Sequence, residues 1–280
     1  MTAPNVRRQR PEFDVCVIGS GAGGGMAAKV LTEAGATVAL LEAGPDWDAQ
    51  RDSAMLKWPY ESPRRGAATP ERHFGEFHAG LGGWSLDGEP YTVEDGEEFR
   101  WFRVRQLGGR TNHWGRISLR FGPWDFRGRS RDGHGDDWPI SYQDVAPYYD
   151  RLERLVGLFG THEGLENEPD GVFLPPPTPR CYERLIEQAS ERVGVPCIPS
   201  RLSILTRPHN GRLACHYCGQ CGRDCGTGSN FSTPSVLLPP ARSTGNLVTI
   251  LGAMARLSLI HISEPTRLES KSRLPCYCFK

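Results

Sequence analysis

The chain has 280 residues, and its 33 lysines and arginines balance 33 aspartates and glutamates, so its formal net charge is zero at pH 7. A chain of this length buries a large core in one or two domains. The interspersed charges leave no basic surface for nucleic acid, and no run of about eighteen apolar residues exists to span a membrane. The amino-terminal stretch lacks an apolar signal region, which predicts a cytoplasmic chain without its own export signal.

A dinucleotide-binding unit is predicted near the amino terminus. The short apolar run DVCVI is typical of a strand buried on both faces. The glycine turn GSGAGG, a helical stretch and a second strand, TVALLEAG, follow it. In this pattern Gly19 permits the tight turn, Gly21 lets the backbone approach a pyrophosphate, and Gly24 lets the helix pack on the strand. Glu42, at the end of the second strand, is the predicted acceptor for ribose hydroxyls.

A second glycine pair precedes a polar and aromatic loop in the segment RQLGGRTNHWGRISLR. The pair marks another place where the backbone approaches a neighbour closely. This loop resembles the second flavin-contacting loop of the glucose–methanol–choline (GMC) oxidoreductases. The resemblance implies FAD as the cofactor, with the following contact residues: Gly108, Gly109, Thr111, Asn112, His113 and Trp114.

The histidine of this loop raises the question of a covalent flavin. The loop is most similar to that of the pyranose oxidase branch, Gly-Gly-x-Ser-Thr-His-Trp, where the histidine is joined to the flavin. That histidine corresponds to His113, and an imidazole nitrogen can attack the activated 8-methyl carbon of the flavin. The chain departs from the branch in having Arg110, Thr111 and Asn112 before the histidine. The alternative is that His113 only packs or forms hydrogen bonds.

Four of the nine cysteines lie close together, at Cys215, Cys218, Cys221 and Cys225. Their C-x2-C-x2-C-x3-C spacing is the bacterial ferredoxin pattern and predicts an iron–sulfur cluster, either 4Fe–4S or 3Fe–4S with one cysteine spare. A zinc site and a metal-free loop are the alternatives. In sugar dehydrogenases of the family a cluster near this position passes electrons from the flavin to a cytochrome. The resemblance therefore favours a dehydrogenase over an oxidase.

The last part of the chain contains two different segments. Residues 246–256 read as a strand and resemble the return of the family's chain to the FAD domain, where backbone near Ala255 meets the adenine. Residues 257–267, LSLIHISEPTR, resemble a translated sequencing adapter, so residues 257–280 are expected to be an artefactual tail. The alternative is a genuine strand, because LSLIHI alternates in polarity. The family's catalytic histidine, paired with a second histidine or an asparagine, is expected to be absent from this chain, which would leave it inactive by itself.

Together these patterns predict an α/β fold, with a Rossmann-like FAD-binding domain built on a central parallel sheet and an α+β substrate or cap domain, both incomplete. Two helices are expected, near residues 141–159 and 178–193. The expected parts are residues 12–125 for the first part of the FAD domain (with 46–104 as a cofactor-covering excursion), 126–209 for the start of the cap domain, and 210–256 for the cysteine segment and the return to the FAD domain.

The resemblance implies an FAD-dependent dehydrogenase that oxidises a CH–OH group, in a sugar or another alcohol, by hydride transfer to the flavin. Electrons would leave through the iron–sulfur cluster to a cytochrome or a quinone. A small partner subunit with an export signal would carry such a chain to the periplasm. Two alternatives stay open: an oxidase that uses oxygen and has a zinc or metal-free cysteine loop, and a non-catalytic FAD and iron–sulfur electron carrier.

Overall fold

The computed structural model describes residues 12–69, 75, 79–80, 82–83, 94–96 and 103–255. The expected tail, residues 257–280, lies outside this range, and so does much of the expected excursion beyond residue 69. Among the described residues, no helix has the length and apolar character needed to cross a membrane.

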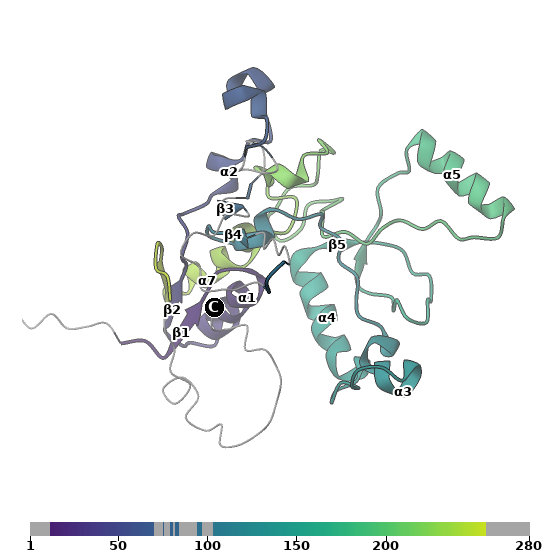
Figure 1. Ribbon diagram of the computed structural model, residues 1–280, viewed down its shortest axis with the longest axis horizontal. Coiled ribbons are helices and arrows are strands. Elements are labelled where there is room, and N and C mark those ends of the chain that lie inside the picture. Colours follow the sequence, from purple (N-terminus) through teal and green to yellow (C-terminus); the bar gives the residue numbers. More distant parts are fainter. Residues whose placement is uncertain are drawn as a thin grey trace, which may run out of the picture.

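A three-stranded parallel sheet organises the first part of the fold (Figure 1). Strand β2 (Val38–Leu41) lies between β1 (Val15–Ile18) and β7 (Leu247–Ile250). Helix α1 (Ala22–Glu33) connects β1 to β2, so the predicted strand–helix–strand unit is confirmed. Strand β7, which follows the cysteine segment in the chain, pairs in parallel along the whole of β2.

The expectation that β1 is buried on both faces is wrong. Strand β2 of this sheet shows that pattern, because it has a strand on each side and its first three residues are buried. In β1 burial alternates, and Cys16 and Ile18 are exposed. The physical reason is position: β1 is an edge strand of the described sheet, and an edge strand presents one face and one row of backbone groups to solvent.

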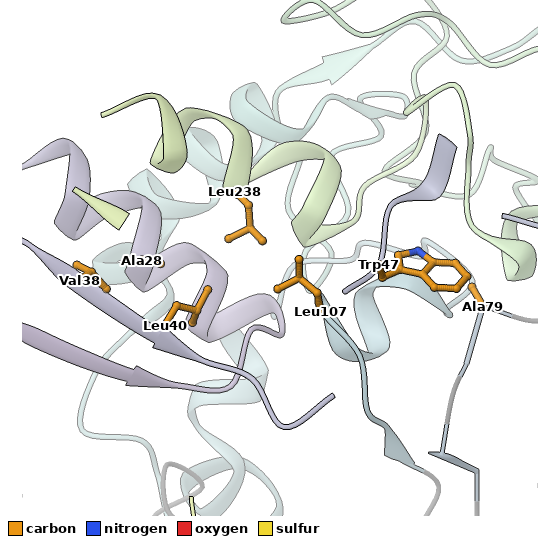
Figure 2. Packing of buried hydrophobic residues seen from close by; sticks show 7 residues of the cluster. All are labelled: Ala28, Val38, Leu40, Trp47, Ala79, Leu107 and Leu238. Atoms are coloured by element: carbon orange, nitrogen blue, oxygen red, sulfur yellow. The ribbon is translucent and has the colours of Figure 1, made fainter. Parts of the chain in front are cut away.

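The main hydrophobic cluster joins the sheet to the helices on one of its faces, as Figure 2 shows. Short helices α6 (Thr233–Val236) and α7 (Leu238–Ser243) lie against α1. Each fully buried leucine in this cluster stabilises the fold by about 1.5–3 kcal/mol. The cluster consists of Ala28, Val38, Leu40, Trp47, Ala79, Leu107 and Leu238.

The segment from residue 126 to 209 contains the two expected helices. Helix α4 (Tyr142–Val156) begins at a capping box in which Ser141 and Asp144 bond reciprocally, and helix α5 (Cys181–Arg192) follows farther along. Helix α5 has no buried residue within the described part of the chain and stands away from the other elements in Figure 1. The shorter elements are α2 (Ala49–Asp52), α3 (Gly128–Asp132), the antiparallel pair β3 (Gly82–Gly83) and β4 (Arg103–Val104), and the parallel pair β5 (Leu158–Phe159) and β6 (Phe173–Leu174).

Candidate functional site

The glycine turn after β1 has the geometry that a dinucleotide site requires. Gly19 adopts a left-handed backbone conformation, with φ at +88°. A Cβ atom at Gly24 would lie 1.8 Å from the carbonyl oxygen of Gly19, so only glycine lets the first turn of α1 press against this turn. A Cβ at Gly21 would meet no protein atom within 4 Å, so the space beside it is open. The chain here leaves room for a ligand at the amino-terminal end of α1, where backbone N–H groups attract phosphate.

A groove of about 340 Å³ opens beside this turn. Its volume falls in the range of ordinary ligand pockets. Arginine side chains are well represented on its wall, and guanidinium groups suit a pyrophosphate because they match its charge and its oxygen spacing. The groove brings together several predicted site residues from distant segments. The residues that line it include Gly19, Ser20, Gly21, Glu42, Arg103, Arg105, Arg110 and Ala255.

Glu42 lines the groove but also has partners within the protein. Its Oε2 atom accepts hydrogen bonds from the backbone N–H of Ser20, at 3.1 Å, and from the Ser20 hydroxyl. Its Oε1 atom accepts from the N–H of Gly44 at 2.9 Å. A carboxylate offers about four acceptor positions, so these three bonds leave capacity for a ribose hydroxyl.

Ser20 is a site residue that the sequence reasoning missed. Its side chain is fully buried, and its hydroxyl oxygen also accepts a hydrogen bond from the N–H of Gly108 at 2.8 Å. One hydroxyl thus ties the end of β2 to the second glycine loop. Its position between Gly19 and Gly21 could have indicated this role, because a small polar side chain there lies close to the groups that the glycine turn contacts.

The second glycine loop packs directly on the first. Gly108 has φ at +90°, and a Cβ there would lie 2.5 Å from Cδ of Pro234 and 2.7 Å from Oδ1 of Asn112. The close approach that the glycine pair predicts at this position is therefore an approach to the protein itself. A Cβ at Gly109 would come within 3.7 Å of the Cα atom of Gly21, which places this loop beside the open space of the first turn.

The side chains of Thr111 and Asn112 support the loop from within. Asn112 is fully buried and donates to the carbonyl of Leu107 at 2.8 Å. The Thr111 hydroxyl donates to the Gly108 carbonyl at 2.6 Å and accepts from the N–H of Thr233 at 2.9 Å. Neither residue lines the groove, so the structure gives both a positioning role within the loop.

His113 faces the cysteine segment. Its Nδ1 atom lies 3.5 Å from the carbonyl oxygen of Gly222, between the third and fourth cysteines of the run. A carbonyl can only accept, so this contact favours the tautomer with its proton on Nδ1 and its lone pair on Nε2. Burial lowers the pKa of His113 below its ordinary value, the Gly222 contact opposes this, and the charge of Arg116 lowers it further. The ring is therefore neutral at pH 7, as a nucleophilic imidazole must be.

Trp114 lies between two parts of the fold. Its indole N–H donates to the carbonyl of Phe231 at 3.3 Å, and the two rings meet edge to face at 6.1 Å. It also lines a cavity of about 330 Å³ between α1 and α4 whose wall is mostly apolar. Such a wall suits an aromatic ring or a hydrocarbon rather than a phosphate. Other residues that line this cavity are Met26, Tyr149, Leu152 and Leu237.

All four cysteines of the run line one small cavity. Their donor chemistry fits a thiolate-ligated metal, yet within the described ranges no three metal-ligating side chains approach closely enough to share an ion. Burial raises the pKa of Cys215 and of Cys221. The structure therefore groups the predicted ligands without closing them into a metal site, and the iron–sulfur prediction remains a prediction.

A buried ion pair joins the second glycine loop, the flavin loop of residues 105–120, to the cysteine run of residues 215–225. Nη2 of Arg116 lies 3.5 Å from Oδ1 of Asp224, and both side chains are almost completely inaccessible to solvent. Asp224 also accepts from the indole N–H of Trp47, at 2.9 Å, and from the N–H of Cys225, at 2.8 Å. The sequence reasoning missed this pair, because no local pattern connects two residues 108 positions apart.

Comparison with known proteins adds the evolutionary relationship. No family model matches the chain. Paromamine 6'-oxidase from Streptomyces fradiae is 30% identical over 256 residues, which cover 87% of this chain and 40% of that protein. The 2-methyl-1,2-propanediol dehydrogenase from Mycolicibacterium austroafricanum is 35% identical over 232 residues, covering 80% of this chain and 39% of that enzyme. The large subunit of fructose dehydrogenase from Gluconobacter japonicus is 26% identical, covering 78% of this chain and 41% of that subunit.

These relatives are oxidoreductases of the GMC family, which this chain resembles over 78–87% of its length. The chain spans about 40% of the length of these relatives. Among solved structures, pyridoxine 4-oxidase from Mesorbium loti superposes with a TM-score of 0.48 at 17% identity, covering 86% of this chain and 42% of that one. The relatives confirm the family resemblance predicted from the sequence, and the parallel sheet with its connecting helix α1 confirms the α/β fold class.

Proposed function

We propose that the chain binds FAD and is the cofactor-binding part of a GMC oxidoreductase that oxidises a CH–OH group. The observation that carries this proposal is the groove where the Gly19–Gly21 turn, Glu42 and Ala255 meet under a wall rich in arginine. The relatives named above are, by their names, an oxidase of paromamine and dehydrogenases of a diol and of fructose, which supports an alcohol or a sugar as substrate. Bound FAD supplies the hydride acceptor, which no side chain can provide.

The residues present suit FAD along the length of the groove. The open space at Gly21 and the first N–H groups of α1 would receive the pyrophosphate. Glu42 would accept the ribose hydroxyls, and backbone at Ala255 would face the adenine at the same end. The loop from Gly109 to Trp114 begins beside Gly21 and would hold the flavin end of the cofactor.

Titration of the purified chain with FAD, followed by flavin fluorescence, tests cofactor binding. We expect saturable binding of FAD. Adenosine diphosphate should compete with FAD, and NAD should bind with lower affinity than FAD. The oxidation is tested with a FAD-loaded form of the protein that is as long as its relatives. Sugars and simple alcohols are added anaerobically, and reduction of the flavin is followed as a loss of its absorbance. Higher affinity for NAD than for FAD, or a bound flavin that no alcohol or sugar reduces, would refute the proposal.

We also propose that a ring nitrogen of His113 forms a covalent bond to the 8-methyl carbon of the flavin. A methyl C–H bond would break, its proton would be lost, and its electron pair would pass through the flavin to the electron acceptor of the enzyme. The support is the loop's similarity to the pyranose oxidase branch, the neutral state that burial imposes on the ring, and the Nδ1 contact that leaves the lone pair on Nε2. Denatured holoprotein should keep its flavin through gel filtration, and H113N should release it. Complete release from the unmodified chain would show that His113 only packs or hydrogen-bonds.

For the cysteine run we propose a 4Fe–4S or 3Fe–4S cluster that takes electrons from the flavin to a cytochrome or a quinone. Two observations support it: the four thiols line one cavity, and His113 of the flavin loop contacts the backbone at Gly222 within the run. We expect iron and acid-labile sulfide in anaerobically purified protein. C221S should lose them, whereas C181S, on the exposed helix α5, should keep them.

Other metal contents point to other functions. Zinc without sulfide, together with oxygen consumption during turnover, would favour the oxidase alternative. Iron and sulfide in a full-length protein that oxidises no alcohol would favour an electron carrier.

A partner subunit completes the proposal. One relative is a large subunit and another, gluconate 2-dehydrogenase from Pantoea cypripedii, is a flavoprotein component by its name, which supports assembly with smaller chains. We propose a small subunit that carries the export signal and a cytochrome that accepts electrons, with function in the periplasm. The chain is expressed with and without the small chain that co-purifies with it, and its amount in the periplasmic fraction of the cells is measured. We expect export only when the partner is present.

A further inference from the structure

Arg116 is a buried cation at the junction of the flavin loop and the cysteine run. It is the largest side chain with no measurable exposure in the described part of the protein. On the flavin-loop side, its guanidinium donates to the backbone carbonyl of Trp114 and to that of Asn112, the latter at 3.3 Å. On the other side lies Asp224, between the third and fourth cysteines. The amide oxygen of Asn230, turned toward Arg116, accepts from Nε at 3.2 Å and from Nη2 at 2.9 Å.

The neighbours shown do not fully balance this charge. A buried cation is costly unless a close anion compensates it. Asp224 is 3.5 Å away, longer than the usual 2.7–2.9 Å of a charge-assisted hydrogen bond, and its carboxylate also accepts from Trp47 and from Cys225. The other partners, the two backbone carbonyls and the Asn230 amide, are neutral. A further negative charge close to Arg116 would therefore stabilise the site.

The cysteine run is where such a negative charge would lie. Asp224 and Asn230, which both contact Arg116, line the same small cavity as the four cysteines, so the guanidinium lies directly behind the wall of that cavity. A metal centre held by four thiolates is anionic, and its net charge becomes more negative on reduction. Arginine stays protonated at neutral pH, so its charge is fixed.

We propose that Arg116 is a positioning residue for the cysteine-bound metal centre: its buried positive charge stabilises the anionic centre, favours the reduced form, and ties the centre to the flavin loop. This inference rests on the metal site proposed above. It makes Arg116 more than a structural bond between two loops, because a purely structural residue would not change the reduction potential of the centre.

The test isolates the charge of Arg116 from the cost of an unpaired Asp224. The D224N variant keeps the arginine and replaces the carboxylate by an amide of the same shape, which can still accept from Trp47. The double variant R116M/D224N then differs from D224N only at Arg116. R116K keeps the positive charge but not the planar fork, and R201M is the matched control. Arg201 is also a buried arginine, but it lies outside the cysteine run and pairs with Asp170 at 3.1 Å.

Each protein is purified anaerobically, and three quantities are measured: iron per chain, iron release to a chelator, and reduction potential by a spectroscopic titration. Relative to D224N, we expect R116M/D224N to bind iron about tenfold to a hundredfold more weakly, as is typical when a residue behind the ligands is lost. Its potential should shift to more negative values. R116K should keep a potential close to that of the unmodified chain, and R201M should match the unmodified chain in all three quantities.

Two outcomes would overturn the inference in distinguishable ways. Equal iron retention and equal potential in D224N and R116M/D224N, with matching urea unfolding midpoints, would show that Arg116 is only structural while the metal site stands. Failure of the unmodified chain to hold iron or zinc would remove the metal site itself, and this inference with it. If R116M/D224N does not fold, a potential in R116K shifted as far as that of a neutral R116Q variant would likewise exclude the charge effect.

Discussion

Alanine substitutions at three glycines of one turn should separate stability from cofactor binding. At Gly24, an added Cβ would lie 1.8 Å from the Gly19 carbonyl oxygen, more than 1 Å below the 3.0 Å that real Cβ contacts respect. The nearest atom is backbone, so the conflict can be relieved only by moving α1 away from β1. At Gly21 and Gly23 the added methyl would meet no protein atom within 4 Å.

The expected magnitudes follow from these contacts. Forcing a methyl group into a packed site costs about 1–3 kcal/mol and occasionally more. Alanine recovers about 1 kcal/mol over glycine within a helix. The net range is then roughly 0–2 kcal/mol, and G24A should lower the free energy of unfolding by about 1–2 kcal/mol, the upper part of that range, because the overlap is with backbone and severe. G23A, exposed in the first turn of α1, should raise it by about 0.5–1 kcal/mol. G21A should lower it by about 1 kcal/mol or less: the φ of −64° suits alanine, but Gly21 is the N-cap of α1, where glycine is preferred over alanine.

Cofactor affinity should follow a different order. The Gly21 methyl would enter the groove where the pyrophosphate is proposed to bind, so G21A should weaken FAD binding at least about tenfold, a loss of about 1.4 kcal/mol. Urea unfolding monitored by tryptophan fluorescence gives the stability, and FAD titration gives the affinity. A G24A protein as stable as the unmodified chain, or a G21A protein with unchanged FAD affinity, would refute the reasoning.

Three further predictions concern other buried groups. S20A should cost about 1–3 kcal/mol of stability, because the Gly108 N–H loses its buried acceptor; an unchanged urea midpoint would contradict this. E153Q weakens the buried pair with Arg120, whose nitrogen lies 2.6 Å from the carboxylate, and should lower the unfolding free energy by about 3 kcal/mol or less, since Arg120 keeps a second acid. Because burial lowers the pKa of His113 in the folded chain, the unfolded chain binds a proton near pH 6.5 that the folded chain does not. Stability should then fall as pH drops below 6.5, and H113N should flatten that dependence in urea titrations at several pH values.

The sequence by itself determined the elements whose causes are local. The apolar strands, the glycine turn and helix α1 lie within one short segment, so residue spacing alone reveals them. The role of Gly24 was predictable for the same reason, since its close contact is with Gly19, five residues earlier. The capping box at Ser141 and the helix after it also depend on neighbours in the chain.

The tertiary structure alone decided which distant segments meet. Burial of β1 was predicted wrongly because a strand's polarity pattern does not reveal whether it lies at an edge. Ser20 bonds to Glu42 and to Gly108, and Arg116 lies beside Asp224, across separations that no local pattern spans. A chain's spacing predicts contacts within a turn or a strand, whereas contacts between loops depend on how the sheet and helices pack. For that reason the glycine residues of the candidate site could be predicted from the sequence, and the buried hydroxyl and ion pair that hold its loops together could not.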